Sequence, residues 1–158
     1  MAFHCFIPRS MPGFLAACLL GGAALSAFGQ AITPAGTWRT IDDNTKKDKS
    51  LVRIVESGGV YTGTVEKIID PDAPSDAVCK DCSDERKDKP VVGMTILRGV
   101  KQSADDKAVF EGGDILDPNN GKVYRVRLKV VDNGTRLEVR GYIGTPMLGR
   151  TQTWVRAE

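Results

Sequence analysis

The residues Val123-Tyr-Arg-Val-Arg-Leu-Lys-Val130 alternate between apolar and basic side chains from Tyr124 onward. Apolar or aromatic residues occupy positions 124, 126 and 128, whereas arginine or lysine occupies positions 125, 127 and 129. Successive side chains of a β-strand point to opposite faces, so this pattern predicts a strand. We expect one face to pack on a core and the other to contact water, as is common in antiparallel sheets.

The residues that follow repeat this alternation in Thr135-Arg-Leu-Glu-Val-Arg-Gly-Tyr-Ile143. Between the two runs lies Asp132-Asn133-Gly134, which is typical of a hairpin turn. The pattern predicts further strands, at residues 37–41, 51–56, 60–69, 91–100, 108–111, 115–116 and 150–156. No segment shows ten residues of helical periodicity. Eight or nine short strands joined by tight turns indicate an all-β protein, with one antiparallel barrel or sandwich.

Residues 1–31 have the features of a secretory signal peptide. Arg9 precedes an uncharged apolar run over residues 14–28, and small residues follow, so cleavage is expected after Gly29 or after Ala31. The run is short for a membrane span, which needs about 20 apolar residues. No later segment is apolar for that length. The sequence therefore predicts an exported protein, periplasmic or secreted, with no transmembrane segment in the mature chain.

Leu15-Ala16-Ala17-Cys18 has the form of a lipoprotein cleavage box, in which Cys18 would carry a lipid anchor. Such a box normally ends the apolar run, whereas Cys18 lies early in it. We therefore favour a cysteine inside a discarded leader over a lipid anchor.

The remaining residues, 32–158, are predicted to form one domain. The only histidine, His4, lies in the leader, so histidine-dependent catalytic triads and histidine-ligated metal sites are excluded. Neither a phosphate-binding nor a dinucleotide-binding glycine loop is present. A net charge of +2 on the 158-residue chain argues against binding of nucleic acid through bulk charge. We expect no catalytic residue, no metal and no cofactor, and interpret the protein as not an enzyme.

Cys79 and Cys82 lie in a charged, proline-containing segment over residues 70–90. An exported chain meets an oxidising compartment, so a local disulfide is expected. A structural disulfide is the favoured interpretation. A redox function and a metal shared with another chain are the alternatives.

Two further groups of residues are candidates for closing the barrel or for binding a ligand. Trp38 in the first strand and Arg156 in the last would meet if the barrel closes, in a cation–π contact that needs no ligand. Arg140, Tyr142, Arg150 and Gln152 lie on the last two predicted strands. By alternation the first two share a face, and so do the last two. Facing inward they would form a polar floor for an anion, and facing outward a solvated surface; the sequence leaves both open.

Five blocks, in order, resemble the DUF2147 family of exported bacterial proteins. They are Ser50-Leu-Val-Arg-Ile54, Lys89-Pro-Val-Val-Gly-Met94, Gly112-Gly113 with Asp117-Pro-x-Asn-Gly121-Lys-x-Tyr124, Leu137-x-Val-Arg-Gly-Tyr-Ile-Gly144 and Gly149-Arg-Thr-Gln-Thr-Trp154. The resemblance runs from about Gly36 to Arg156. It implies a lipocalin-like (calycin-like) antiparallel barrel but no catalytic residue, because the function of the family is not established. Gly36-x-Trp38 is similar to the opening motif of lipocalins, and the lipocalin analogy implies a small apolar ligand in the barrel mouth.

The sequence thus predicts a single lipocalin-like barrel of eight or nine strands that binds a small apolar or amphipathic ligand, such as a fatty acid. The first alternative is an interaction module of the cell envelope with a filled barrel, which contacts a protein partner through the 70–90 segment or an edge strand. The second is a thiol-redox protein that uses Cys79 and Cys82.

Overall fold

The computed structural model describes residues 32–43 and 45–157. The predicted signal peptide, its cleavage site between Gly29 and Ala31, and Cys18 lie outside these residues. Among the helices in the described ranges, none has both the length and the apolar character that crossing a membrane requires.

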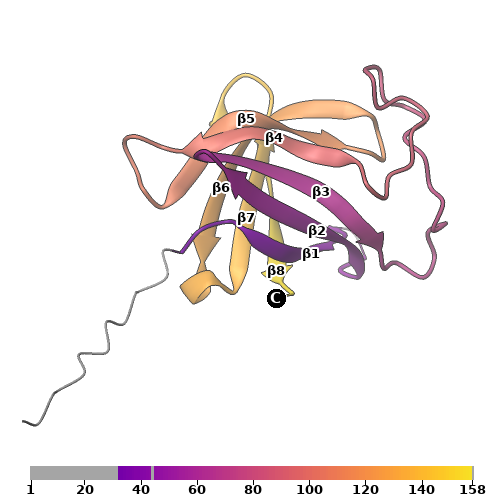
Figure 1. The fold of residues 1–158 in the computed structure, drawn as a ribbon, viewed down its shortest axis with the longest axis horizontal. Helices are drawn as coiled ribbons and strands as arrows, with labels where there is room; N and C mark the ends of the chain where they lie inside the picture. The colour runs from indigo at the N-terminus through magenta and orange to yellow at the C-terminus, as the bar shows by residue number, and fades with distance from the viewer. Residues whose placement is uncertain (1–31, 44, 158) are drawn as a thin grey trace, which may run out of the picture. The chain divides into compact units, whose positions relative to one another are not determined.

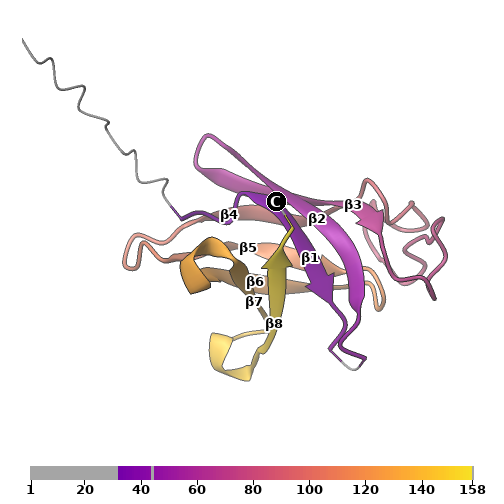
Figure 2. The ribbon, with the colours of Figure 1, turned by 90° about the horizontal axis from the view of Figure 1, so that it is seen from below.

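The described chain folds into a closed antiparallel barrel in which each strand pairs with the next and β8 pairs with β1 (Figures 1 and 2). The strands are β1 (Gly36–Ile41), β2 (Asp48–Ser57), β3 (Val60–Ile68), β4 (Thr95–Gln102), β5 (Val109–Asp117), β6 (Lys122–Val131), β7 (Arg136–Tyr142) and β8 (Arg150–Arg156). Two short 3₁₀ turns, η1 (Asp132–Gly134) and η2 (Pro146–Leu148), are the only helical elements in the part of the chain described. The predicted all-β fold and single antiparallel barrel are confirmed.

The barrel has eight strands because the predicted strands 108–111 and 115–116 are one strand, β5. The register with β6 shifts between Glu111 and Asp114, which marks a bulge at two glycines. Gly112 has a φ of 85°, and a Cβ atom on Gly113 would lie 2.1 Å from the Arg98 carbonyl oxygen. The glycine pair thus lies inside one strand and allows it to bend.

The strand predicted at residues 91–100 begins only at Thr95. Before it, the amide of Met94 donates to the Val91 carbonyl at 3.1 Å, and Gly93 has a φ of 87°. Residues 91–94 therefore form a turn, which is fastened to β3 by the Gly93 amide bonded to the Val65 carbonyl. The apolar residues of this stretch therefore belong to a turn, in which Met94 is buried and Val92 is exposed.

The two ends of the barrel differ in their connections. At one end, which we term the closed end, the strands are joined by residues 58–59, 103–108 and 132–135, and the chain enters β1 and leaves β8. At the other, the open end, the connections are residues 42–47, 69–94, 118–121 and 143–149. The long segment between β3 and β4 projects to one side of the barrel in both ribbon views (Figures 1 and 2).

Arg156 joins three parts of the chain at the closed end. Its guanidinium donates to the backbone carbonyls of Thr33, Ala35 and Gly134, and lies 4.2 Å from the centre of the Trp38 ring. The Trp38 indole in turn donates to the Pro34 carbonyl at 2.7 Å. Arg156 on β8 therefore links the start of the barrel to its last strand, beside the short ladder between β1 and β8.

Large apolar side chains fill the interior beside this contact. Tyr61 and Phe110 pack edge to face with ring centres 5.1 Å apart. The other buried side chains in this half include Trp38, Val52, Ile54, Val100, Leu128 and Leu137. The barrel is therefore solid toward its closed end, which leaves the open end as the place where a small molecule can enter.

Candidate functional site

A cavity of about 980 Å³ occupies the open half of the barrel. Its deep part is apolar and is lined by residues that include Val65, Ile96, Ile115, Leu116, Tyr124, Val139 and Trp154. Its mouth is polar and is lined by residues that include Asp42, Asp43, Lys49, Lys80, Asp81, Asp117, Asn119 and Arg150. The cavity can therefore surround an apolar group while a polar group stays at the mouth.

The floor of the cavity is set by the last two strands. Trp154 pairs with Leu137, and Gln152 pairs with Val139. Trp154 and Val139 line the cavity, whereas Leu137, one step toward the closed end, is completely buried and does not. Trp154, Val139 and Leu137 therefore mark the boundary between the filled half of the barrel and the open half.

Gly141 widens the cavity next to this floor. An added Cβ atom would meet Tyr124 at 3.5 Å and Ile115 at 3.8 Å, which are ordinary contact distances. A Cβ atom therefore fits at this position in ordinary contact with its neighbours, and Gly141 itself lines the cavity.

The structure places the four predicted ligand residues differently. Arg150 and Gln152 line the cavity, on the face of β8 that also carries Trp154. Tyr142, the last residue of β7, lies at the cavity rim. Arg140 is not among the lining residues.

Arg140 contacts the β7–β8 connection instead of the cavity. Its Nε donates to the Pro146 carbonyl at 2.7 Å, and its Nη atoms donate to the Met147 carbonyl and to the Thr151 hydroxyl. Simple alternation put Arg140 and Tyr142 on one face. The structure separates their surroundings because β7 ends at Tyr142, where the chain turns across the mouth.

Asp43, which the sequence analysis did not select, binds both inward polar residues of β8. Its Oδ2 accepts hydrogen bonds from an Arg150 Nη and from Gln152 Nε2, the second at 2.8 Å. Gln152 Oε1 accepts from the Trp154 indole at 3.3 Å. A chain of polar contacts thus runs from the exposed Arg150 through Asp43 and Gln152 to the cavity floor. We refer to Asp43, Arg150 and Gln152 as the rim cluster.

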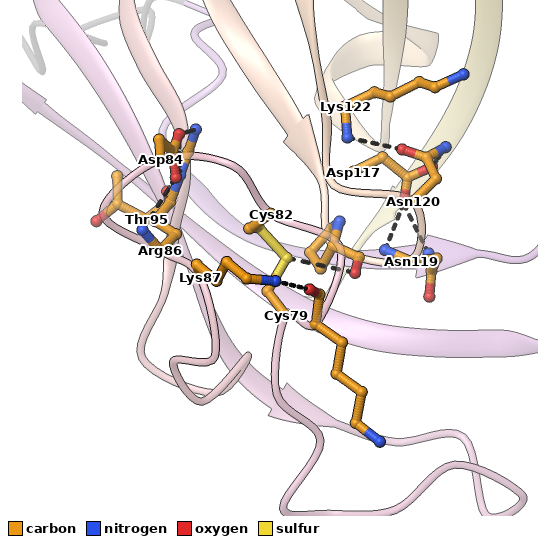
Figure 3. The surroundings of a disulfide bond; sticks show 12 residues. Cys79, Cys82, Asp84, Arg86, Lys87, Thr95, Asp117, Asn119, Asn120 and Lys122 are labelled. Carbon is orange, nitrogen blue, oxygen red and sulfur yellow. Dashed lines mark hydrogen bonds and ion pairs between the residues drawn. A yellow bond between two sulfur atoms is a disulfide. The ribbon is translucent and has the colours of Figure 1, made fainter.

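The segment between β3 and β4 forms one wall of the mouth and contains the predicted disulfide. Cys79 and Cys82 are bonded, and both are buried, at 0% and 2% exposure. Figure 3 shows the bond beside the β5–β6 turn that carries Asp117, Asn119 and Asn120. A Cβ atom on Gly121 would lie 1.9 Å from the Asp81 carbonyl oxygen, so only glycine permits this approach. Burial of both sulfur atoms favours a structural role, because thiol–disulfide exchange needs access to a sulfur.

A buried arginine fastens the same segment to the barrel. Arg86 is 5% exposed. Its guanidinium donates to the Asp84 carboxylate, with an Nη2–Oδ2 distance of 2.5 Å, and to the Thr95 carbonyl at 3.1 Å. Hydrogen bonds from Arg86 lower the pKa of Asp84 from 3.8 to about 2. The carboxylate therefore stays charged over the ordinary pH range and neutralises the buried cation.

The β7–β8 connection exposes apolar side chains at the opposite side of the mouth. Ile143, Met147 and Leu148 are 68%, 88% and 84% exposed. Ile143 and Leu148 also line the cavity. In the described residues, no group of three or more histidine, cysteine or acidic side chains is arranged to hold a metal ion.

The model of a bacterial family, described as "Uncharacterized protein conserved in bacteria (DUF2147)", matches residues 36–156. The chain belongs to the DUF2147 family. The match covers every strand of the barrel, and the family predicted from the five sequence blocks is confirmed. Among curated proteins, none matches this DUF2147 chain.

A solved structure similar to this DUF2147 barrel is "Protein HP1028 from the human pathogen Helicobacter pylori", which is described as belonging to the lipocalin family. The two chains are 23% identical, with a TM-score of 0.66 over 78% of this chain and 82% of the other. At this level of identity the likeness concerns the fold: the DUF2147 barrel is lipocalin-like.

Proposed function

We propose that this DUF2147 protein binds a small amphipathic molecule in the open half of its barrel. The observation that carries the proposal is the cavity of about 980 Å³, with an apolar interior and a polar mouth. Pockets that hold small ligands commonly measure about 300–1,000 Å³ and combine apolar walls with a few polar groups. In this assignment the ligand tail contacts the apolar walls near Trp154, and the polar group stays near the rim cluster. No described residue is given a catalytic role.

The apolar interior also predicts how the affinity for a ligand depends on the length of its apolar tail. Burial of one methylene group contributes about 0.8 kcal/mol. Affinity for a series of straight-chain alcohols should therefore rise about fourfold for each added methylene until the cavity is full. A site that contacted only the polar group would not show this dependence.

The predicted leader over residues 1–31 is the basis for the proposed location. In this proposal the protein is exported and meets its ligand in the periplasm or outside the cell. The compartment also suits the disulfide, since such bonds persist in oxidising surroundings.

The first experiment is a titration of purified protein with N-phenyl-1-naphthylamine, a neutral apolar probe whose fluorescence rises in apolar surroundings. Gly141→Leu places a side chain in the cavity and should weaken probe binding at least tenfold, because it removes space the probe needs. Thr153→Leu is the matched control, since Thr153 is exposed on β8, outside the cavity. Equal binding by wild type, Gly141→Leu and Thr153→Leu would contradict the proposal.

A second candidate function is an interaction module of the cell envelope. The observation in its favour is the exposed apolar group of Ile143, Met147 and Leu148. Such patches commonly mark contact surfaces. This function requires no ligand. It would be favoured over ligand binding if Met147→Ser/Leu148→Ser abolished capture of a partner protein while Gly141→Leu left that capture unchanged.

A further inference from the structure

The rim cluster presents a carboxylate at the place where the polar group of a ligand would lie. Asp43 comes from the β1–β2 connection, and its partners Arg150 and Gln152 come from β8. Both partners donate to the same oxygen, Oδ2, and all three residues line the cavity. Arg150 and Gln152 thus form two converging donors, and their shared acceptor belongs to the protein itself.

We infer that Asp43 is a built-in occupant of the headgroup site, and that a ligand carboxylate displaces it from Arg150 and Gln152. This inference rests on the proposed function and adds the class of ligand, an amphiphile with a single carboxylate. The carboxylate of such a molecule offers the two donors the same oxygens that Asp43 offers. Its tail would continue past Gln152 toward Trp154, which donates to Gln152 at 3.3 Å and keeps that amide turned toward the rim.

The ion pair between Asp43 and Arg150 is of a kind in which another anion can readily replace the aspartate. The Arg150 side chain is 67% exposed and that of Asp43 is 23% exposed. Ion pairs in contact with water contribute little, because water and salt screen them. A ligand carboxylate can therefore replace Asp43 at small cost, while the buried tail supplies the affinity. Asp43 lies on a connection with no strand partner of its own, so it can move away without breaking a ladder.

Other charges at the mouth favour a monoanion over a phosphate. Asp42, Asp81 and Asp117 line the same mouth, where Lys49 and Lys80 supply two positive charges. A phosphate group carries up to two negative charges near neutral pH, and the acids of the mouth outnumber its lysines, so a second negative charge would meet more repulsion than attraction. One carboxylate matches the single guanidinium of Arg150 without adding a second charge beside these three acids.

The test compares two ligands of equal chain length, decanoate and decanol, by competition with N-phenyl-1-naphthylamine on the full purified chain. Asp43→Asn removes the competing charge and should raise decanoate affinity about fivefold, the upper range for an exposed ion pair. Decanol affinity should stay within twofold of wild type. Asp81→Asn is the matched control, because it removes one charge at the mouth without contacting Arg150. It should change decanoate affinity by less than twofold.

The double variant Asp43→Asn/Arg150→Gln tests whether the gain in decanoate affinity depends on Arg150. It should return decanoate affinity to the wild-type value or below, with decanol again unchanged. Thermal melting of each variant shows that it is folded, and Asp43→Ala serves as a second test of the same position if Asp43→Asn melts early.

The outcomes separate the two proposals. Binding of decanol without a selective gain for decanoate in Asp43→Asn overturns the role of Asp43 and leaves ligand binding intact. An equal gain in Asp81→Asn does the same, because it reduces the effect to general charge at the mouth. Failure of both ligands and of the probe to bind wild type overturns the proposed function and, with it, this inference.

Discussion

The closed end and the open end of the barrel use tryptophan in different ways. Trp38 is completely buried, donates to the Pro34 carbonyl and lies against the Arg156 guanidinium. Trp154 is also buried, at 2% exposure, but it lines the cavity and donates to Gln152 of the rim cluster. These are the only two tryptophans of the chain. One contributes to a filled core and the other to the floor of a hollow, so stability and binding are concentrated at different ends.

The connections show the same division. At the closed end, the strands are joined by short turns, and Arg156 donates to three backbone carbonyls. At the open end, the segment at residues 69–94 is long, and it contains a disulfide and the buried Arg86, which donates to the Thr95 carbonyl of β4. This long connection adds Cys79, Cys82 and Met94 to the buried core, and its exposed residues form part of the mouth.

The strongest test of this comparison replaces each tryptophan by alanine. Trp38→Ala should lower the free energy of unfolding by about 3–5 kcal/mol, as is typical for loss of a buried aromatic side chain. Trp154→Ala should cost less, since the indole already faces open space on one side, but it should weaken binding of N-phenyl-1-naphthylamine. Urea unfolding measures the first effect and probe titration the second. Equal losses of stability in the two variants would contradict the division between the ends.

The second test removes the disulfide with Cys79→Ala/Cys82→Ala. The ring it closes is very small, so the loss in unfolding free energy should be about 2 kcal/mol or less. Amide hydrogen exchange should speed up at residues 117–121, which pack against the disulfide segment, while the amides of β1 and β8 keep their protection. Loss of protection throughout the barrel would show instead that the closed end depends on the open end.

The smallest expected effect concerns pH. The pKa of Asp84 is about 2 in the folded protein, below its ordinary value of 3.8, because of the hydrogen bonds from Arg86. A lowered folded pKa means that this contribution to stability is complete above about pH 4 and is lost as the pH falls toward about 2. Asp84→Asn should be less stable than wild type at neutral pH, and the difference in urea midpoint should shrink across this acidic window. A difference that stays constant down to pH 2 would show that the charge of Asp84 does not stabilise the fold.

The barrel could be predicted because its signal is local. The alternation in β6, with Val126 and Leu128 buried and Arg125 and Lys129 exposed, depends only on the two-residue repeat of a strand. The bulge at Gly112 and Gly113 could not be predicted, because the sequence does not distinguish glycines that bend a strand from glycines that end one.

The candidate site was only partly predictable. Alternation placed Arg150 and Gln152 on one face, and both line the cavity, whereas their proposed contact with a ligand stays a prediction. Arg140 was grouped with Tyr142, but its bonds to Pro146 and Met147 arise from the course of the β7–β8 connection, which alternation does not describe. Asp43 was missed because it lies 107 positions from Arg150, and nothing in its own neighbourhood distinguishes it from other loop acids.

The ladder between β1 and β8 pairs only Trp38 with Arg156 and Arg39 with Val155. Arg156 also bonds to Ala35, 121 positions earlier in the chain. A chain synthesised from its N-terminus therefore has an incomplete sheet with two unprotected edges until β8 is available. Contacts between such distant residues form slowly, and exposed edges associate with other chains. β8 thus determines whether a nascent chain closes its barrel or associates with other chains, and truncation before Arg150 should yield aggregates instead of a smaller barrel.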